Sequence, residues 1–202
     1  VKRRAGRVPG LEDVVGIAAG ENHTCAIVGE GRQVWCWGLL DAATSRYLNA
    51  EERAPPGYTR GSARVERGIP VDPALGATPA ARRSPGTTGI NRLSCGSAHC
   101  CATGDSGGTC FGLGGEFSSH RSQPTREVPA LSNAIQLSSR ALVTYGLMPD
   151  GGLVFVRLVE DGTFESVPIA GLPSMRSVAA GEIHACALTA DGADIWCWKH
   201  AQ

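Results

Sequence analysis

The sequence predicts an all-β protein built from repeated units, of the kind that forms a β-propeller. One pattern of three short apolar segments, joined by a Gly-x-x-His turn and a glycine-containing turn, recurs along the 202 residues, and such self-similarity is typical of propellers and other repeat folds. The segments are apolar on both faces, which suits blades packed between neighbouring blades. Glycine accounts for 27 residues, roughly twice the usual share, as many tight turns require.

Four units follow one another in a single predicted domain, residues 1–202. Each begins at a Val-Pro or Ile-Pro step, where proline fits a strand start or edge because it has no N–H to donate. The predicted units are about 8–68, 69–127, 128–166 and 167–202. The first predicted strands are Ile17–Ala19, Leu93–Cys95, Leu137–Ser139 and Val178–Ala180. The middle strands centre on Cys25, Cys101, Tyr145 and Cys186, and the closing strands are Trp35–Gly38, Thr109–Gly112, Val154–Arg157 and Trp196–Lys199.

The first two units are longer than the others because of two predicted surface insertions, residues 39–68 and 72–89. Surface insertions either are solvated loops or carry recognition. Tyrosine and arginine are favoured at protein interfaces. The first insertion therefore suggests four partner-contacting residues, which are Arg46, Tyr47, Tyr58 and Arg60.

The eight cysteines have recurring positions on the predicted middle and closing strands. Directly opposite residues of an antiparallel pair are close enough for a disulfide, which predicts Cys25–Cys36, Cys101–Cys110 and Cys186–Cys197. The third unit has Tyr145 and Phe155 instead, so both cysteines are missing together. Cys95 and Cys100 remain and could bridge their own hairpin, although Cys100 could also replace Cys101 as the partner of Cys110. Zinc sites usually show more closely spaced cysteines, so we expect no metal.

The GDSGG string and the recurring histidines suggest catalysis or metal binding, but their positions in the repeat explain both of them without such chemistry. Gly104–Gly108 reads GDSGG, the string around the nucleophile of trypsin-like serine proteases, and His99 precedes it. A catalytic triad brings its base from a separate element, whereas these residues belong to one hairpin. His99 occupies the same turn position as His23 and His184, so we expect these histidines to bond their own turn or the next blade. We therefore expect neither an enzyme nor a cofactor.

The four tryptophans, Trp35, Trp37, Trp196 and Trp198, alternate with cysteine on two closing strands, and we expect them between blades. The charges balance, with 19 Lys and Arg against 19 Asp and Glu. Hence nothing in the net charge favours a nucleic-acid partner or an anionic membrane. No stretch of about 18 apolar residues is present, so we expect no membrane insertion. An even number of strand-borne cysteines favours an oxidising compartment and predicts a secreted, periplasmic or cell-surface protein.

The segments IAAGENHTCAIVGEGRQVWCWG and VAAGEIHACALTADGADIWCWK resemble the repeat of the regulator of chromosome condensation family, in its cysteine-bearing, extracytoplasmic bacterial form. The resemblance implies a β-propeller of four-stranded blades. Propellers of this family usually have seven blades, and this chain shows four units. They either close a four-bladed ring, with residues 1–7 completing the last blade, or form an arc of a larger propeller whose other blades lie elsewhere.

The function expected from these observations is a non-enzymatic, extracytoplasmic scaffold that mediates protein–protein interaction. Its partner would be another protein, within a surface assembly or among other propeller blades. An alternative is a secreted enzyme inhibitor or lectin, since a β-lactamase-inhibiting propeller resembles this family. A third is an intracellular guanine-nucleotide exchange factor or chromatin binder, as the family's name suggests. The zero net charge and the paired cysteines count against this third function.

Overall fold

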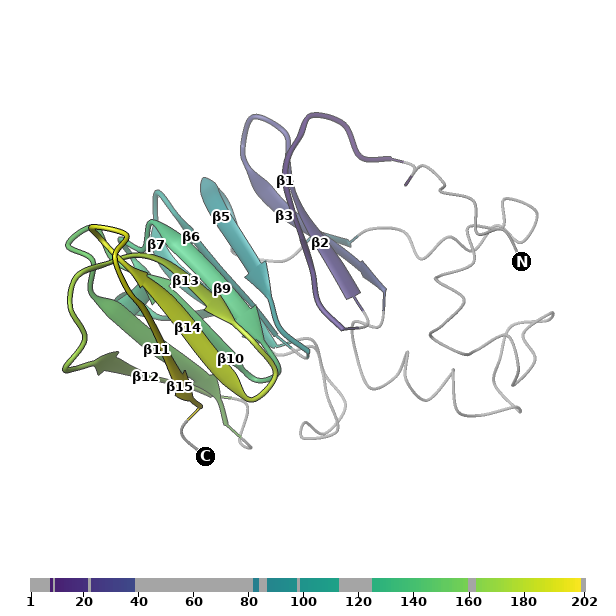
Figure 1. The fold of residues 1–202 in the computed structure, drawn as a ribbon. Coiled ribbons are helices and arrows are strands. Elements are labelled where there is room, and N and C mark those ends of the chain that lie inside the picture. Colours follow the sequence, from purple (N-terminus) through teal and green to yellow (C-terminus); the bar gives the residue numbers. More distant parts are fainter. Residues whose placement is uncertain are drawn as a thin grey trace, which may run out of the picture.

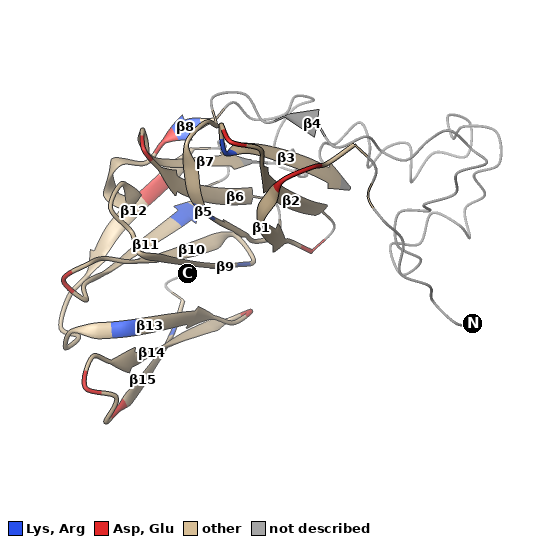
Figure 2. Ribbon diagram, turned by 90° about the horizontal axis from the view of Figure 1, so that it is seen from above, with Lys and Arg blue, Asp and Glu red and all other residues tan. Residues whose placement is uncertain are grey.

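A computed structural model of the chain describes residues 8, 10–21, 23–38, 82–83, 87–97, 99–112, 125–159 and 163–200. These residues form four antiparallel sheets, which follow one another along an arc, so that the first and the last sheet lie at opposite ends (Figure 1; Figure 2). The sheets are propeller blades, and the predicted all-β propeller is confirmed. Among the described residues, no helix has the length and apolar character needed to cross a membrane.

Each blade is a meander in which sequence neighbours pair. Blade 1 consists of β1 (Val14–Ala19), β2 (His23–Val28), β3 (Gln33–Gly38) and β4 (Arg82–Arg83). Blade 2 consists of β5 (Ile90–Cys95), β6 (His99–Gly104), β7 (Gly107–Gly112) and β8 (Arg126–Glu127). The 3-10 turn η2 (Pro129–Leu131) leads to blade 3, which consists of β9 (Gln136–Arg140), β10 (Val143–Leu147), β11 (Leu153–Leu158) and β12 (Phe164–Ile169). Blade 4 has β13 (Met175–Ala180), β14 (His184–Thr189) and β15 (Ile195–Lys199).

The fourth strands lie where sequence patterns are weakest. Strand β12 contains Val167 and Pro168, and Pro168 pairs with Val154 at the outer edge of blade 3. The Val-Pro step therefore lies in the last strand of a sheet, where a missing N–H breaks no ladder bond on the solvent side. Strand β4 falls inside the predicted insertion 72–89. It was not predicted as a strand because its two arginines show no apolar alternation. The division of the chain into four units stays a prediction.

Each blade has two packing faces, since successive side chains of a strand point to opposite sides. In blade 1, the forward face is the side of the sheet that carries Cys25 and Cys36. In the other blades it is the side that carries the residues at the equivalent strand positions. The opposite side, with Ala26 and Trp35 in blade 1, is the backward face. The forward face of each blade packs on the backward face of the next. The first such core contains Ala18, Cys25, Ile27, Val34 and Cys36 of blade 1 with Ile90, Cys95, Cys100, Ala102 and Phe111 of blade 2.

Side chains of the first strands also bond neighbouring blades. The Gln136 side chain accepts from the Val178 N–H at 3.1 Å and donates to the Val178 carbonyl at 3.0 Å. The hydroxyl of Ser138 accepts from the Ala180 N–H, and that of Ser94 accepts from the Ser139 N–H, each at 2.9 Å. These bonds satisfy backbone groups between blades and hold the first strands of blades 2, 3 and 4 in register.

The Gly-x-x-His turn has a local steric reason. The Gly20 N–H donates to the His23 carbonyl at 2.9 Å, and the Gly96 N–H donates to the His99 carbonyl at 2.9 Å. The imidazole then folds back over the glycine, so a Cβ at Gly20 or Gly96 would overlap the histidine ring. A Cβ at Gly96 would also overlap the Ala141 carbonyl oxygen of the next blade. Glycine thus permits both the turn and the close approach of two blades.

This geometry predicts that Gly96→Ala lowers the free energy of unfolding by about 2–3 kcal/mol, because the added methyl must push backbone against backbone. Gly31→Ala is the control, since a Cβ there meets only the Gln33 side chain at 3.6 Å. Urea unfolding of both variants measures the difference. Equal stabilities for the two variants would show that the close approach at Gly96 is not required.

Candidate functional site

The predicted partner-contacting residues Arg46, Tyr47, Tyr58 and Arg60 lie outside the described residues, together with most of both predicted insertions. Their role stays a prediction. The chemistry that the structure does describe is concentrated between the blades, where cysteine and histidine side chains from different repeats meet.

Four disulfides join directly opposed strand positions and involve all eight cysteines of the sequence. Cys25–Cys36, Cys101–Cys110 and Cys186–Cys197 each link a middle strand to a closing strand. Cys95–Cys100 links the first strand of blade 2 to its middle strand. The Cα atoms of the four pairs are 4.0–4.1 Å apart, as in narrow antiparallel pairs.

An aromatic pair takes the place of the disulfide in blade 3. Tyr145 and Phe155 are opposite in register, and their ring centroids are 5.4 Å apart. The Tyr145 hydroxyl accepts from Trp198 Nε1 at 3.2 Å and lies 2.9 Å from His200 Nδ1. Trp198 therefore packs between blades 3 and 4, as expected, whereas Trp196 is exposed on the last strand.

Two of the recurring histidines reach across to the next blade. Nε2 of His99 lies 2.7 Å from the Thr144 hydroxyl, which in turn lies 2.7 Å from the Ser139 hydroxyl. Nε2 of His23 lies 3.3 Å from Cys100 Sγ. Both imidazoles are buried, while His184 at the end of the arc is exposed. The expected bond to the next blade is thus present at His23 and His99.

Burial keeps these two imidazoles neutral. It lowers the pKa of His23 from 6.5 to about 4. It also lowers the pKa of His99 to about 4, with a smaller contribution from the nearby His23. A protonated imidazole would carry its charge in a site with little water, and this desolvation disfavours the protonated form.

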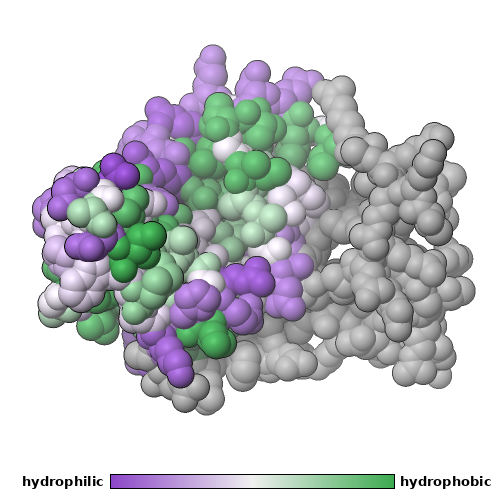
Figure 3. All heavy atoms as spheres, viewed as in Figure 1, coloured by the Kyte–Doolittle hydropathy of each residue, from purple (hydrophilic) through white to green (hydrophobic). Residues whose placement is uncertain are grey.

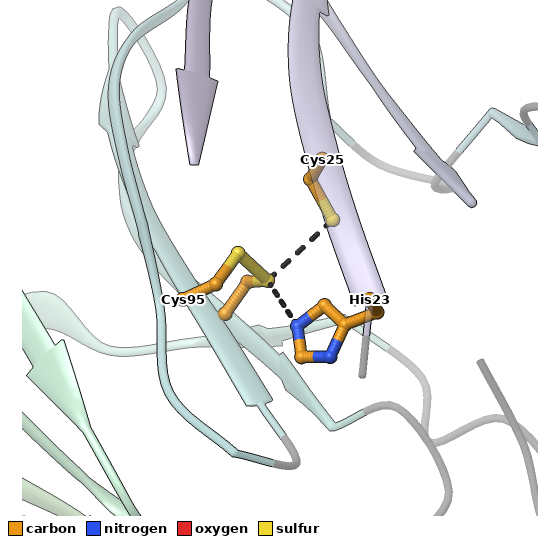
Figure 4. A group of neighbouring side chains, drawn as sticks. His23, Cys25 and Cys95 are labelled. Carbon is orange, nitrogen blue, oxygen red and sulfur yellow. Dashed lines mark hydrogen bonds between the residues drawn. A yellow bond between two sulfur atoms is a disulfide. The ribbon is translucent and has the colours of Figure 1, made fainter. Parts of the chain in front are cut away.

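The densest group of reactive side chains lies between blades 1 and 2 (Figure 4). Cys100 Sγ lies 3.5 Å from Cys25 Sγ and 3.3 Å from the His23 ring. The ligand-type atoms of His23, Cys25, Cys95 and Cys100 all lie within 4.8 Å of one another. The two cysteines in contact, Cys25 and Cys100, are 75 residues apart in sequence, so no local spacing pattern could have revealed the cluster.

This cluster has the residue types of a zinc site, but its cysteines are not thiolates. Zinc binds thiolate sulfur, and all three cysteine sulfurs here belong to disulfides. The arrangement instead brings two disulfides into van der Waals contact across a blade boundary. Contact of this kind permits thiol–disulfide exchange once one of the four sulfurs is freed.

The GDSGG motif forms the turn between β6 and β7. Ser106 is exposed at this turn, whereas His99 is buried at the other end of β6 and bonded to Thr144. Six residues of strand place those ends roughly 17 Å apart. Asp105 is held by its N–H, which donates to the Gly89 carbonyl at 3.0 Å, and by Asn91 Nδ2 at 3.2 Å. His99 therefore cannot act as a base for Ser106.

Large apolar side chains remain exposed at both ends of the arc. In blade 1 they are Val14, Val15 and Ile17, and around blade 4 they are Ile183, Ile195 and Trp196. Figure 3 shows apolar surface over the region of β1. Charged residues of both signs are interspersed along the strands and turns (Figure 2). Exposed apolar clusters mark surfaces that interact.

The buried histidines predict an acid-sensitive fold. The unfolded chain protonates them below about pH 6.5, whereas the folded chain does so only near pH 4. The free energy of unfolding should therefore fall as pH drops from 6.5 toward 4, by up to about 3 kcal/mol per histidine. His23→Gln/His99→Gln should flatten this slope in urea unfolding, and the exposed His184→Gln should not. A slope unchanged in the double variant would contradict the assignment.

The contact between the two disulfides predicts an exchange product. In Cys36→Ser, the freed Cys25 thiolate attacks Cys100 Sγ, forming Cys25–Cys100 and releasing Cys95 as a thiolate. Peptide mapping by mass spectrometry, after alkylation without reductant, should recover Cys25 joined to Cys100. Cys197→Ser is the matched control, because Cys186 lies on the open end of the arc and should stay a free thiol. Recovery of Cys25 as a free thiol in Cys36→Ser would contradict the exchange.

Residues 14–39 match the model of the regulator of chromosome condensation (RCC1) repeat. No curated protein matches the sequence. Among solved structures, Prp20p of Saccharomyces cerevisiae superposes with a TM-score of 0.60 at 17% identity, covering 95% of this chain and 47% of its own. Human WBSCR16 superposes with a TM-score of 0.59 at 15% identity, covering 93% and 47%.

The receptor kinase CR4 ectodomain of Physcomitrella patens superposes with a TM-score of 0.50 at 14% identity, covering 95% of this chain and 42% of that one. The chain therefore spans less than half the length of each of these structures. At these identities the likeness shows the fold alone. The chain is a propeller similar to RCC1-type proteins, and it carries the RCC1 repeat in its first blade.

Proposed function

We propose that this protein is a non-enzymatic, extracytoplasmic propeller scaffold that binds another protein. It needs no cofactor, and neither nucleic acid nor membrane insertion forms part of its role. The observation that carries the proposal is that the described cysteine and histidine side chains serve structural contacts. The cysteines are joined in disulfides, and the two buried histidines bond neighbouring blades.

The surface supports a binding role. The described residues keep isoleucine and valine side chains exposed at the ends of the arc, where they can be buried by a partner. Prp20p, a propeller of similar fold, has binding properties toward Gsp1p and histones, and it has also been crystallised with Kap60. For this chain we propose a protein partner of its own, contacted through Arg46, Tyr47, Tyr58 and Arg60 of the predicted first insertion.

The disulfides support a location outside the cytoplasm. Four disulfides in 202 residues would be opened by the thiol pools of the cytoplasm, but they persist in oxidising compartments. We therefore propose a secreted, periplasmic or cell-surface protein.

The partner is tested by comparative capture. Immobilised wild-type protein is exposed to the envelope and secreted proteins of its own organism, beside Arg46→Ala/Tyr47→Ala/Tyr58→Ala/Arg60→Ala. Truncating interface tyrosines and arginines typically costs about 2 kcal/mol or more each, so the partner should be enriched on the wild type and lost from the variant. The control is Arg126→Ala/Glu127→Ala on the exposed strand β8. Equal retention by all three proteins, or none above bare resin, would contradict the proposal.

A further inference from the structure

The two ends of the arc each present a blade face that has no neighbouring blade among the described residues. On the backward face of blade 1, Ile17 is 69% exposed, and on the forward face of blade 4, Ile195 is 71% exposed. The equivalent positions inside the arc are partly or fully buried. Val178, equivalent to Ile17, is 2% exposed, and Val34, equivalent to Ile195, is fully buried.

The two open faces are the matching halves of one contact. The strand register gives the forward face of blade 4 the same composition as that of blade 1: His184, Cys186–Cys197, Leu188 and Ile195 stand where His23, Cys25–Cys36, Ile27 and Val34 stand. The backward face of blade 1 likewise repeats that of blade 4, with Ile17, Ala26 and Trp35 in place of Val178, Ala187 and Trp196. Forward and backward faces of this kind already join three times within the chain.

The open ends also carry both halves of the histidine contact. Between blades 2 and 3, His99 meets Thr144 at 2.7 Å, and Thr144 is the second residue of its middle strand. The second residue of the middle strand of blade 1 is Thr24. At the other end, His184 is exposed and begins the middle strand of blade 4. A blade 1 placed against blade 4 would therefore bring the Thr24 hydroxyl to the His184 ring.

We propose that the partner of these faces is a second copy of this chain, joined head to tail so that blade 4 of each copy packs on blade 1 of the other. One chain covers 47% of Prp20p, so two chains would cover about the length of one such propeller. Two copies provide eight blades, within the usual range of four to eight. The two contacts are related by a two-fold axis. The end faces consist of described residues and do not include Arg46, Tyr47, Tyr58 or Arg60, so each proposal is tested by its own variants and either can fail alone.

Light scattering of the full chain after size exclusion tests the proposal. The wild type should have twice the 21.0 kDa mass of one chain. Ile17→Asp and Ile195→Asp each bury an uncompensated carboxylate in both contacts of the dimer. Each should weaken dimerisation by at least about a hundredfold and give a monomer. Val167→Asp is the control, because Val167 is exposed on the outer strand of blade 3 and should leave the dimer intact.

Mixing the two variants supplies the decisive arm. In a head-to-tail dimer of Ile17→Asp with Ile195→Asp, both carboxylates fall in one contact and the other contact is entirely wild type. The mixture should therefore regain the dimer mass, which also shows that both variants fold. A monomeric wild type, as in a ring closed within one chain, would overturn the proposal. So would a dimer that either variant leaves intact, or a mixture that stays monomeric.

Discussion

A propeller blade is a sheet with two apolar faces, and it is stable only when both faces are covered. Every other feature of this structure depends on that requirement. The forward face of one blade meets the backward face of the next at close range, and the residues that bring them together recur from repeat to repeat. Where a neighbouring blade is missing among the described residues, at the two ends of the arc, apolar side chains remain in contact with solvent. Covering these two ends would therefore remove exposed apolar surface from solvent and stabilise the arc.

The Gly-x-x-His turn shows how one short motif serves both the hairpin and the blade boundary. Within the hairpin, the glycine N–H and the histidine carbonyl close the turn, and the glycine makes room for the ring. Across the boundary, the same ring supplies a polar contact to the next blade, to Thr144 from His99 and to Cys100 from His23. Because these imidazoles are buried and neutral, they add polar specificity without a buried charge.

Sequence patterns predicted those parts of the fold that depend on contacts within one hairpin. Spacings of 11 and 9 residues between cysteines reflect the two-residue period of a strand and its turn, so opposed positions could be inferred. Contacts between blades have no such period. The meeting of Cys25 with Cys100 depends on how two repeats stack, and 75 residues separate them.

Short strands were also missed, for a related reason. Strand β4 consists of Arg82 and Arg83 and pairs with β3, which depends on backbone hydrogen bonds rather than on side-chain pattern. The exposure of Trp196 could not be inferred either, because its sequence context matches that of the half-buried Trp35. The two tryptophans take equivalent positions on the backward faces of blades 1 and 4, so their difference in exposure depends on how each blade is packed rather than on the repeat.

The aromatic pair of blade 3 gives the arc an uneven response to its chemical surroundings. Blades 1, 2 and 4 each have a disulfide across their hairpins, whereas blade 3 has the packed pair Tyr145 and Phe155 at that position, beside the backbone pairing of its strands. A reductant therefore has nothing to break in blade 3, and the same blade carries the hydrogen bonds that seat blade 4. Reduction would remove the covalent cross-links of blades 1, 2 and 4 and would break no bond within blade 3. Blade 3 is thus the described blade whose internal contacts do not depend on the redox state of cysteine.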